Sequence, residues 1–76
     1  MEETIISRNE IAELKPYERL DLIMDKFGIT SSELGRVSGV SVASLSRIRR
    51  GQLEGQVSTW KKISDALVLP MDWFFN

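Results

Sequence analysis

The 76-residue chain contains no cysteine and no histidine. Without cysteine it has no disulfide framework and no thiolate metal site, and without histidine it lacks the commonest metal ligand and the usual general base. No apolar run reaches membrane-spanning length, and the first residues, Met1-Glu2-Glu3, are acidic where a secretory signal would be basic. We therefore expect a soluble cytoplasmic protein that is not an enzyme, needs no cofactor or metal and does not bind membranes.

The net charge of −1 conceals an uneven distribution of charge along the chain. Residues 1–34 carry eight acidic and four basic side chains, a net −4, whereas residues 35–64 carry six basic and one acidic, a net +5. A basic segment of this kind can bind a polyanion even on an acidic protein, because the attraction to phosphate is short-ranged in physiological salt. The charge pattern is therefore compatible with DNA binding by the middle of the chain.

Helix-start signals divide the chain into an N-terminal extension and one helical domain. The sequence SRNE at residues 7–10 fits a capping box, which predicts a short helix over residues 8–14. Pro16 then suits the first turn of the next helix. We expect residues 1–15 to form the extension and residues 16–76 to form a single all-α domain, since a chain this short builds one small core.

Residues 30–50 carry the pattern of two helices joined by a tight turn. The sequence TSSE, which begins this segment, is a capping box and predicts a helix over residues 31–38. Gly39 follows it, where a sharp turn between helices needs a positive φ. Ser41 then caps a second helix, predicted over residues 42–50.

The side chains of this helix pair are those that close packing requires. Gly35 lies on the inner face of the first helix, where a side chain would obstruct the approach of the second. Leu45 and Ile48 face the core from the second helix. Each feature alone is weak evidence, but their joint spacing is what a helix-turn-helix requires.

The remainder of the chain predicts two further helical segments. The first is marked by apolar residues at helical spacing: Val57, Trp60, Ile63 and Leu67. Pro70 interrupts it, and the closing sequence MDWFFN predicts a last helical turn that returns Trp73 or Phe74 to the core.

Two segments resemble the lambda-repressor/Cro-like (XRE) helix-turn-helix domains. They are ITSSELGRVSGVSVASLSRIRRG, at residues 29–51, and ISDALVLPMDWFFN, at residues 63–76. The resemblance runs from about residue 17 to the end of the sequence. It implies a five-helix DNA-binding domain, usually dimeric on a two-fold operator, with the helix after Ser41 in the major groove of double-stranded DNA.

The chain departs from the pattern of that family at several positions. Val68 stands where a glycine is common, so we expect the helix to be terminated in another way, through the proline that follows. Arg49 stands where a glutamate is usual, and its arginine partner is replaced by Met24, so both halves of a frequent ion pair are missing. We expect Arg49 to turn toward phosphate, or toward Asp21 and Asp25.

Helix geometry assigns roles within the predicted recognition helix over residues 42–50, because its N-terminal turns point into the groove. The predicted base contacts are Val42, Ala43, Ser46 and Arg47. Arg47 would donate two hydrogen bonds to guanine, worth about 1–3 kcal/mol of discrimination, and the two apolar side chains would contact thymine methyl groups. The predicted phosphate contacts are Thr30, Ser31, Ser32, Ser44, Arg49, Arg50 and Gln52. We expect a modest salt dependence, equal to about three or four phosphate contacts per subunit.

A purely structural reading of the same residues stays open. Serines at these positions are cap or surface residues in most helical proteins, and arginines at the end of a helix complement its negative dipole. Aromatic residues at helical spacing are more often core than interface, although Met71 and Phe75 could form a dimer patch.

Two functions therefore follow as hypotheses. The first is a sequence-specific transcriptional regulator, a repressor or Cro-like protein of the phage type, that binds a DNA operator as a homodimer. The second is a protein-binding module on the same fold, such as an antitoxin, that uses residues 1–16 to bind a partner. The apolar residues of that extension are Ile5, Ile6, Ile11 and Leu14.

Overall fold

The computed structural model describes residues 13–75, which contain five α-helices joined by turns and loops. They are α2 (Pro16–Phe27), α3 (Ser31–Ser38), α4 (Val42–Arg49), α5 (Val57–Leu67) and α6 (Asp72–Phe75). No strand occurs within these residues, so the predicted all-α, five-helix class is confirmed. The short helix predicted over residues 8–14 falls mainly outside the described residues, and Glu13 and Leu14 are not helical.

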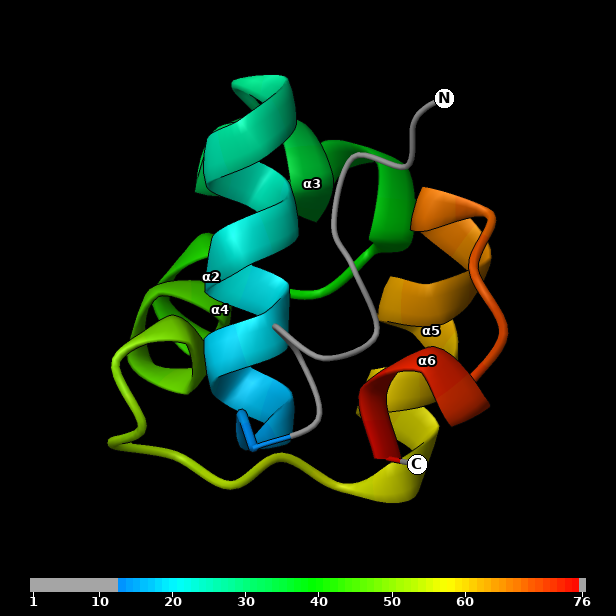
Figure 1. Ribbon diagram of the computed structural model, residues 1–76. Coiled ribbons are helices and arrows are strands. Elements are labelled where there is room, and N and C mark those ends of the chain that lie inside the picture. The colour runs from blue at the N-terminus through cyan, green and yellow to red at the C-terminus, as the bar shows by residue number, and fades with distance from the viewer. Residues whose placement is uncertain (1–12, 76) are drawn as a thin grey trace.

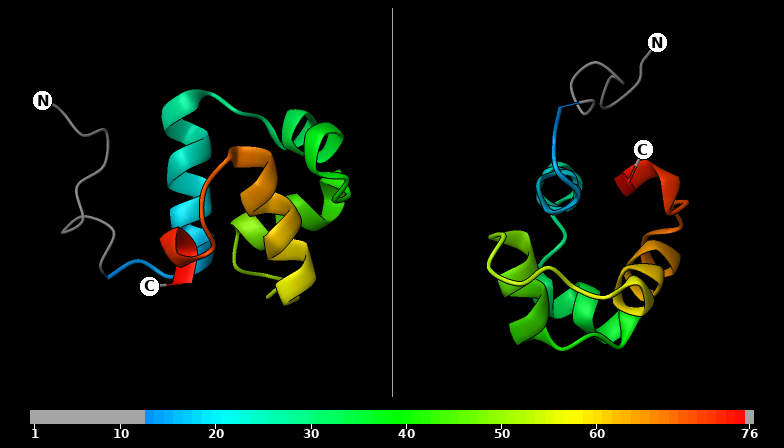
Figure 2. Two further views of the ribbon diagram at one scale, coloured as in Figure 1. Left: turned by 90° about the vertical axis from the view of Figure 1, so that its right-hand side faces the viewer. Right: turned by 90° about the horizontal axis from the view of Figure 1, so that it is seen from below.

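The helices surround one core, with α4 and α5 on opposite sides of it (Figures 1 and 2). Every helix contributes to this core, whose buried apolar residues are Leu20, Ile23, Met24, Leu34, Val40, Leu45, Ile48, Trp60, Ile63 and Phe74. The short helix α6 packs beside α2 and brings Phe74 into the centre, where its ring centroid lies 5.2 Å from that of Trp60. The predicted return of the C-terminal turn to the core is therefore confirmed, with Phe74 as the buried residue.

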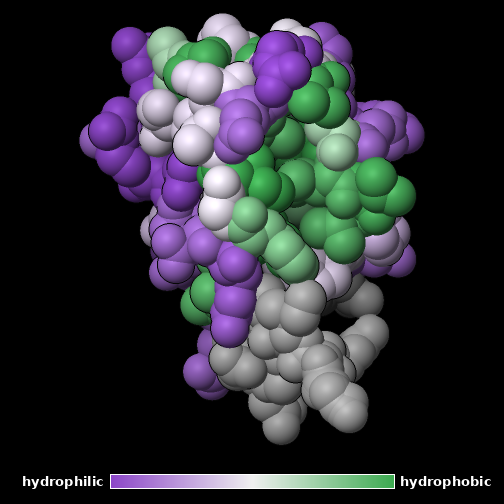
Figure 3. Space-filling view, turned by 90° about the horizontal axis from the view of Figure 1, so that it is seen from above, coloured by the Kyte–Doolittle hydropathy of each residue, from purple (hydrophilic) through white to green (hydrophobic). Residues whose placement is uncertain are grey.

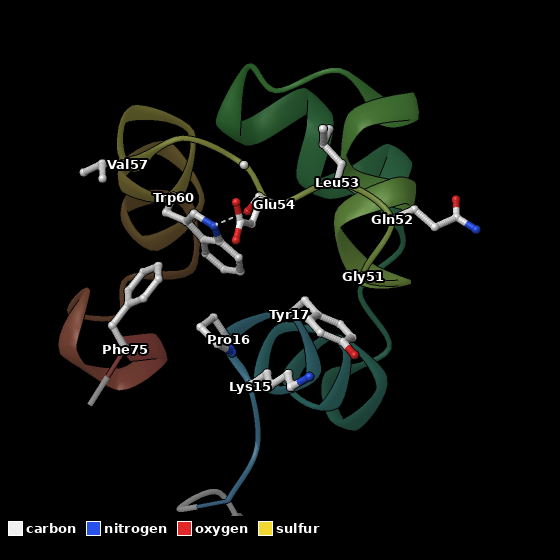
Figure 4. Close-up of a pocket in the computed structure, with 11 residues that line it drawn as sticks. Lys15, Pro16, Tyr17, Gly51, Gln52, Leu53, Glu54, Val57, Trp60 and Phe75 are labelled. Carbon is white, nitrogen blue, oxygen red and sulfur yellow. Dashed lines mark hydrogen bonds between the residues drawn. The ribbon is translucent and has the colours of Figure 1, made fainter.

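The predicted placement of Val57 in the apolar stripe of α5 is wrong. Its side chain is 75% exposed, whereas Trp60 and Ile63 on the same helix are buried. Val57 is the first residue of α5, and it points away from Trp60 into solvent (Figure 4). The stripe therefore begins one turn later than the spacing of the apolar residues indicates.

A buried arginine joins α2 to both ends of the described chain. Arg19 is only 4% exposed, and its Nε donates to the carbonyl oxygen of Leu14 at 3.1 Å. Its Nη1 donates to the carbonyl oxygen of Trp73 at 2.9 Å. A buried guanidinium is tolerated where its donors meet acceptors, because the cost of removing the charge from water is then offset. Arg19 thus ties α6 to the start of α2.

The end of α5 is formed by a valine in the left-handed conformation. Val68 has φ of 57° and ψ of 43°, and its N–H donates to the carbonyl oxygen of Asp65. The N–H of Leu69 donates to the carbonyl oxygen of Ser64 at 3.0 Å, which completes a Schellman-type cap. The expectation that Pro70 ends this helix is therefore wrong, since the chain has already turned two residues earlier.

Replacing Val68 with glycine is expected to raise the stability of the domain. The left-handed conformation costs a residue with a Cβ about 1–2 kcal/mol, and the greater freedom of glycine in the unfolded chain takes back part of that gain. A net gain of about 0.5–1 kcal/mol corresponds to a rise of roughly 2–8 °C in the midpoint of thermal unfolding, measurable by circular dichroism.

The matched control is Val37→Gly, because Val37 is an exposed valine inside α3 with ordinary helical geometry. Glycine at this position should lower stability by a few tenths of a kcal/mol. A midpoint for Val68→Gly that equals or lies below that of the parent chain would contradict the assignment of strain to Val68.

Candidate nucleic-acid interface

The turn between α3 and α4 lets the two helices pack closely together at Gly35. Gly39 has φ of 82°, and its N–H donates to the carbonyl oxygen of Gly35 at 2.9 Å. A Cβ on Gly35 would lie 2.9 Å from the carbonyl oxygen of Val40 and 3.1 Å from Cγ2 of Val42. Both glycines therefore have the roles that the sequence predicts, one as the turn and the other as the point of close approach.

The outer side of α4 is exposed and basic. Leu45 and Ile48 hold its inner side in the core, both at 0% exposure. Ala43, Arg47 and Arg50 recur at i, i+4 and i+7 on the opposite side, and all three are exposed. Arg47, the predicted base reader, therefore stands on the ridge that α4 presents to solvent.

The other predicted contact residues differ in their exposure. Of the base contacts, Val42 is 44% exposed and Ser46 is half-buried. Among the predicted phosphate contacts the exposed residues are Thr30, Ser32, Arg50 and Gln52, and the half-buried residues are Ser31, Ser44 and Arg49. These residues lie on α4, on the turn that follows it and at the start of α3, and Gln52 also lines the groove described below. The contacts themselves remain predictions.

The predicted capping box is present at the start of α3. The hydroxyl oxygen of Thr30 accepts from the N–H of Glu33 at 3.1 Å, and the N–H of Thr30 donates to Oε1 of Glu33 at 2.9 Å. The Thr30 hydroxyl also donates to the same carboxylate oxygen. A phosphate at this helix start would therefore meet the first-turn N–H groups of Ser31 and Ser32 more readily than the Thr30 side chain.

These bonds hold the pKa of Glu33 below its usual value of 4.5, mainly through the backbone N–H of Thr30 and then through its hydroxyl. The positive charge of Arg36 lowers it further. Because the pKa is lower in the folded chain, the contribution of this carboxylate to stability is fully present above the unfolded pKa. It is lost as the pH falls through the folded pKa.

Arg49 connects α4 to both α2 and α3. Its Nε and Nη2 lie 2.9 and 2.8 Å from Oδ1 of Asp21, and its Nη1 donates to the hydroxyl of Ser31 at 3.3 Å. Of the partners that the sequence suggests for Arg49, Asp21 is the one to which it binds in the free chain. Met24 is fully buried in the core. The ion pair between Arg49 on α4 and Asp21 on α2 thus replaces the missing family pair, with the arginine on the other helix.

A groove of about 580 Å³ lies between the start of α2, the loop after α4 and the helices α5 and α6 (Figure 4). We call it the Trp60 groove, and its apolar lining is Pro16, Tyr17, Leu53, Val57, Trp60 and Phe75. The indole N–H of Trp60 donates to the carbonyl oxygen of Glu54, and the ring of Phe75 stands edge-on to that of Trp60.

The sequence suggested Phe75 as part of a dimer patch, and Phe75 is 51% exposed at the rim of this groove. Met71, the other suggested residue, is half-buried, and its sulfur accepts a hydrogen bond from Ser64. The contributions of Tyr17 and Leu53 were not predicted, because they depend on how the loop after α4 folds against α2.

None of the helices within residues 13–75 is both long and apolar enough to cross a membrane.

Comparison with known families supports this arrangement of the helices. The family model described as helix-turn-helix matches residues 20–74, which covers α3, α4, α5 and most of α2 and α6. Searches of curated proteins and of solved structures gave no match. With a two-helix turn, an exposed basic ridge and a family match over most of its length, the chain belongs to the lambda-repressor/Cro-like (XRE) helix-turn-helix family of DNA-binding domains.

Proposed function

We propose that this protein is a sequence-specific transcriptional regulator, a repressor or Cro-like protein that binds a DNA operator through α4. The observation that carries the proposal is the ridge of Ala43, Arg47 and Arg50, which faces away from the core beside the start of α3. An α-helix with its side chains is about 10–12 Å in diameter, which fits the major groove of B-DNA, about 12 Å wide.

The chemistry of the ridge supports readout of bases as well as attraction to phosphate. Arg47 carries a planar fork of donors that matches the two acceptors of guanine in the major groove. Val42 and Ala43, one turn earlier, offer apolar contact to thymine methyl groups. Serine hydroxyls and first-turn N–H groups at the start of α3 then fix the register of the helix on the backbone.

The Trp60 groove supports a homodimer on a two-fold operator. Leu53, Val57 and Phe75 are 41%, 75% and 51% exposed, so three large apolar side chains stand at the surface around it. An isologous contact between two such patches would remove them from water and would place two α4 helices on successive half-sites.

Selection from random duplex DNA tests this function directly. The proposal predicts recovery of two-fold symmetric sequences with half-sites about one helical turn apart, bound by two chains. The affinity should fall with salt as expected for about three or four phosphate contacts per subunit. Recovery of no common sequence, together with equal binding to every duplex, would show that the protein does not read bases.

Replacing Asp21 with asparagine is expected to tighten operator binding. Asp21 places a negative charge beside Ser31 and holds Arg49, whose side chain is 24% exposed. Loss of that charge would remove repulsion of the nearby phosphate and release Arg49 toward it, which we expect to raise affinity about two- to fivefold at low salt. The salt dependence should rise by about one phosphate contact, as measured by fluorescence anisotropy.

Asp65→Asn is the matched control, because Asp65 pairs with Lys61 on α5 at 3.0 Å and both side chains are exposed. Each variant should change the free energy of unfolding by less than about 1 kcal/mol. Equal effects of the two variants on operator affinity, or weaker binding by Asp21→Asn, would count against phosphate contact by Arg49.

A further inference from the structure

Methionine provides the only sulfur atoms of this chain, because the sequence contains no cysteine. Two of the three methionines lie within the described residues, and Met1 lies outside them. Met24 is fully buried in the core, whereas Met71 is half-buried in the link between α5 and α6. Oxidants that add oxygen to sulfur act on the more exposed side chain first, so a peroxide would reach Met71 before Met24.

The link that carries Met71 runs from the end of α5 to the start of α6 (Figure 2). It begins at Val68, which is 88% exposed, and Pro70 is exposed as well. Figure 3 looks onto the end of the molecule where α5 finishes, and hydrophobic residues stand at the surface there. Met71 therefore lies on a segment of the chain that small solutes can reach.

The sulfur of Met71 lies against a buried hydroxyl. Its Sδ is 3.1 Å from Oγ of Ser64, a residue of α5 that is only 1% exposed. The same Oγ is 2.8 Å from the carbonyl oxygen of Trp60. A hydroxyl has one hydrogen to donate, so the sulfur and the carbonyl oxygen share it. The carbonyl oxygen takes the larger share, because a thioether sulfur is a weak acceptor.

Met71 also holds the start of α6. Its carbonyl oxygen accepts from the N–H groups of Phe74 and Phe75 at 2.9 and 3.2 Å. Phe74 is fully buried, and Phe75 lines the Trp60 groove. The rings of both residues lie against that of Trp60, with centroids 5.2 and 5.3 Å away. A displacement of Met71 would therefore move the two aromatic residues that α6 packs against α5.

We propose that Met71 is an oxidation site, that hydrogen peroxide is its oxidant, and that the sulfoxide loosens α6 from α5. The sulfur takes one oxygen atom from the peroxide as the O–O bond breaks, and water is the other product. The sulfur is thereby oxidised by two electrons and the peroxide is reduced. Sulfoxide reductases reverse the step with a dithiol, which is oxidised to a disulfide while the oxygen leaves as water.

The sulfoxide changes the contact with Ser64 in two ways. Its oxygen is a much stronger acceptor than a thioether sulfur, so it competes with the carbonyl oxygen of Trp60 for the single hydroxyl hydrogen. The added oxygen also needs space beside a sulfur that already lies 3.1 Å from Oγ. A polar group at the edge of a core costs free energy unless it is hydrogen-bonded, so the oxidised side chain moves toward water.

This movement would carry Phe75 away from Trp60 and open one wall of the Trp60 groove. If that groove is the dimer contact, oxidation would also weaken operator binding, a consequence that rests on the proposed function. The oxidation itself and its effect on α6 require neither a dimer nor DNA.

Peptide mass mapping of the full chain after treatment with hydrogen peroxide measures the site directly. Met71 should gain one oxygen about tenfold faster than Met24. The midpoint of thermal unfolding, followed by circular dichroism, should fall by roughly 4–8 °C in the Met71 sulfoxide and recover after enzymatic reduction. The control is Met71→Leu, which keeps an apolar side chain of similar volume without sulfur, so its midpoint should not respond to peroxide.

Ser64→Ala tests the part that the hydroxyl plays. This variant removes the hydrogen for which the sulfoxide and the carbonyl oxygen compete, so its midpoint should fall on oxidation by about half as much as that of the parent chain, or less. Each variant is compared before and after peroxide, so a change in its starting stability does not affect the comparison.

Oxidation of Met24 as fast as that of Met71 would overturn the assignment of the site. An unchanged midpoint in the Met71 sulfoxide, or an equal fall in Met71→Leu, would overturn the effect on α6. An undiminished fall in Ser64→Ala would overturn the role of the hydroxyl. Because no DNA is present in these measurements, a failure here leaves the proposed function standing, and a failure of the proposed function leaves these results unchanged.

Discussion

Replacing Arg47 with alanine is expected to weaken binding to the selected operator by about 1–3 kcal/mol, roughly 5- to 150-fold. The loss of affinity is expected to be this large, and the loss of stability small, because of where Arg47 lies on α4. Arg47 is exposed on the outer side of α4, opposite the fully buried Leu45 and Ile48, so its removal should take away the predicted base contact without disturbing the core. Stability should therefore change by less than about 0.5 kcal/mol.

The measurement compares two duplexes at several salt concentrations. Arg47→Ala should bind the selected operator much more weakly than the parent chain does. Its affinity for a scrambled duplex should fall much less, because only one charge has been removed. The control is Lys62→Ala, which removes the same charge from an exposed position on α5. If both variants lower the affinity for both duplexes equally, Arg47 does not contact bases.

Replacing Gly35 with valine is expected to destabilise the domain by about 3 kcal/mol or more. A Cβ at this position meets the carbonyl oxygen of Val40 at 2.9 Å, and a backbone atom in a tight turn cannot move away as a flexible side chain can. The two methyl groups of valine would add contacts with Val42 and Leu45. We expect the packing of α3 against α4 to be lost before the remainder of the core.

Urea unfolding followed by circular dichroism measures this effect. Arg36→Val is the control, since it places the same β-branched residue at the next, exposed position of α3 and should cost only a few tenths of a kcal/mol. Gly35→Ala should fall between the two, because alanine adds the clashing Cβ without the methyl groups but improves helix propensity. Unfolding of Gly35→Val at the urea concentration of the parent chain would show that the two helices have more room than the structure gives them.

Local signals in the sequence were sufficient to predict the helix-turn-helix. Capping at Thr30 and Ser41 and the left-handed turn at Gly39 depend on residues within three or four positions of each other. The apolar anchors Leu45 and Ile48 have the spacing of one helix face. Only the end of α4 differs, since the helix predicted over residues 42–50 ends at Arg49.

Long-range contacts explain what the sequence did not reveal. The acceptors of Arg19 are the carbonyl oxygens of Leu14 and Trp73, and Trp73 is 54 residues away in the chain. Any helical arginine has the same local pattern, so the burial of this one follows only from the placement of α6.

The choice between Asp21 and Asp25 for Arg49 is a similar case. The two carboxylates are one turn apart on the same helix, and the way α2 crosses α4 brings Asp21 to the guanidinium. At Val68 the sequence misled, because a β-branched residue is disfavoured in the left-handed conformation that it adopts there.

The most direct test of the account is a nuclear magnetic resonance titration of isotope-labelled protein with the selected operator duplex. If α4 enters the major groove, the largest changes are expected in the amide signals of residues 41–47 and 30–32, with small changes across α5 and α6 away from a dimer contact. Changes concentrated on α5 and α6, with the signals of α4 unmoved, would contradict the assignment of α4 as the helix that enters the groove.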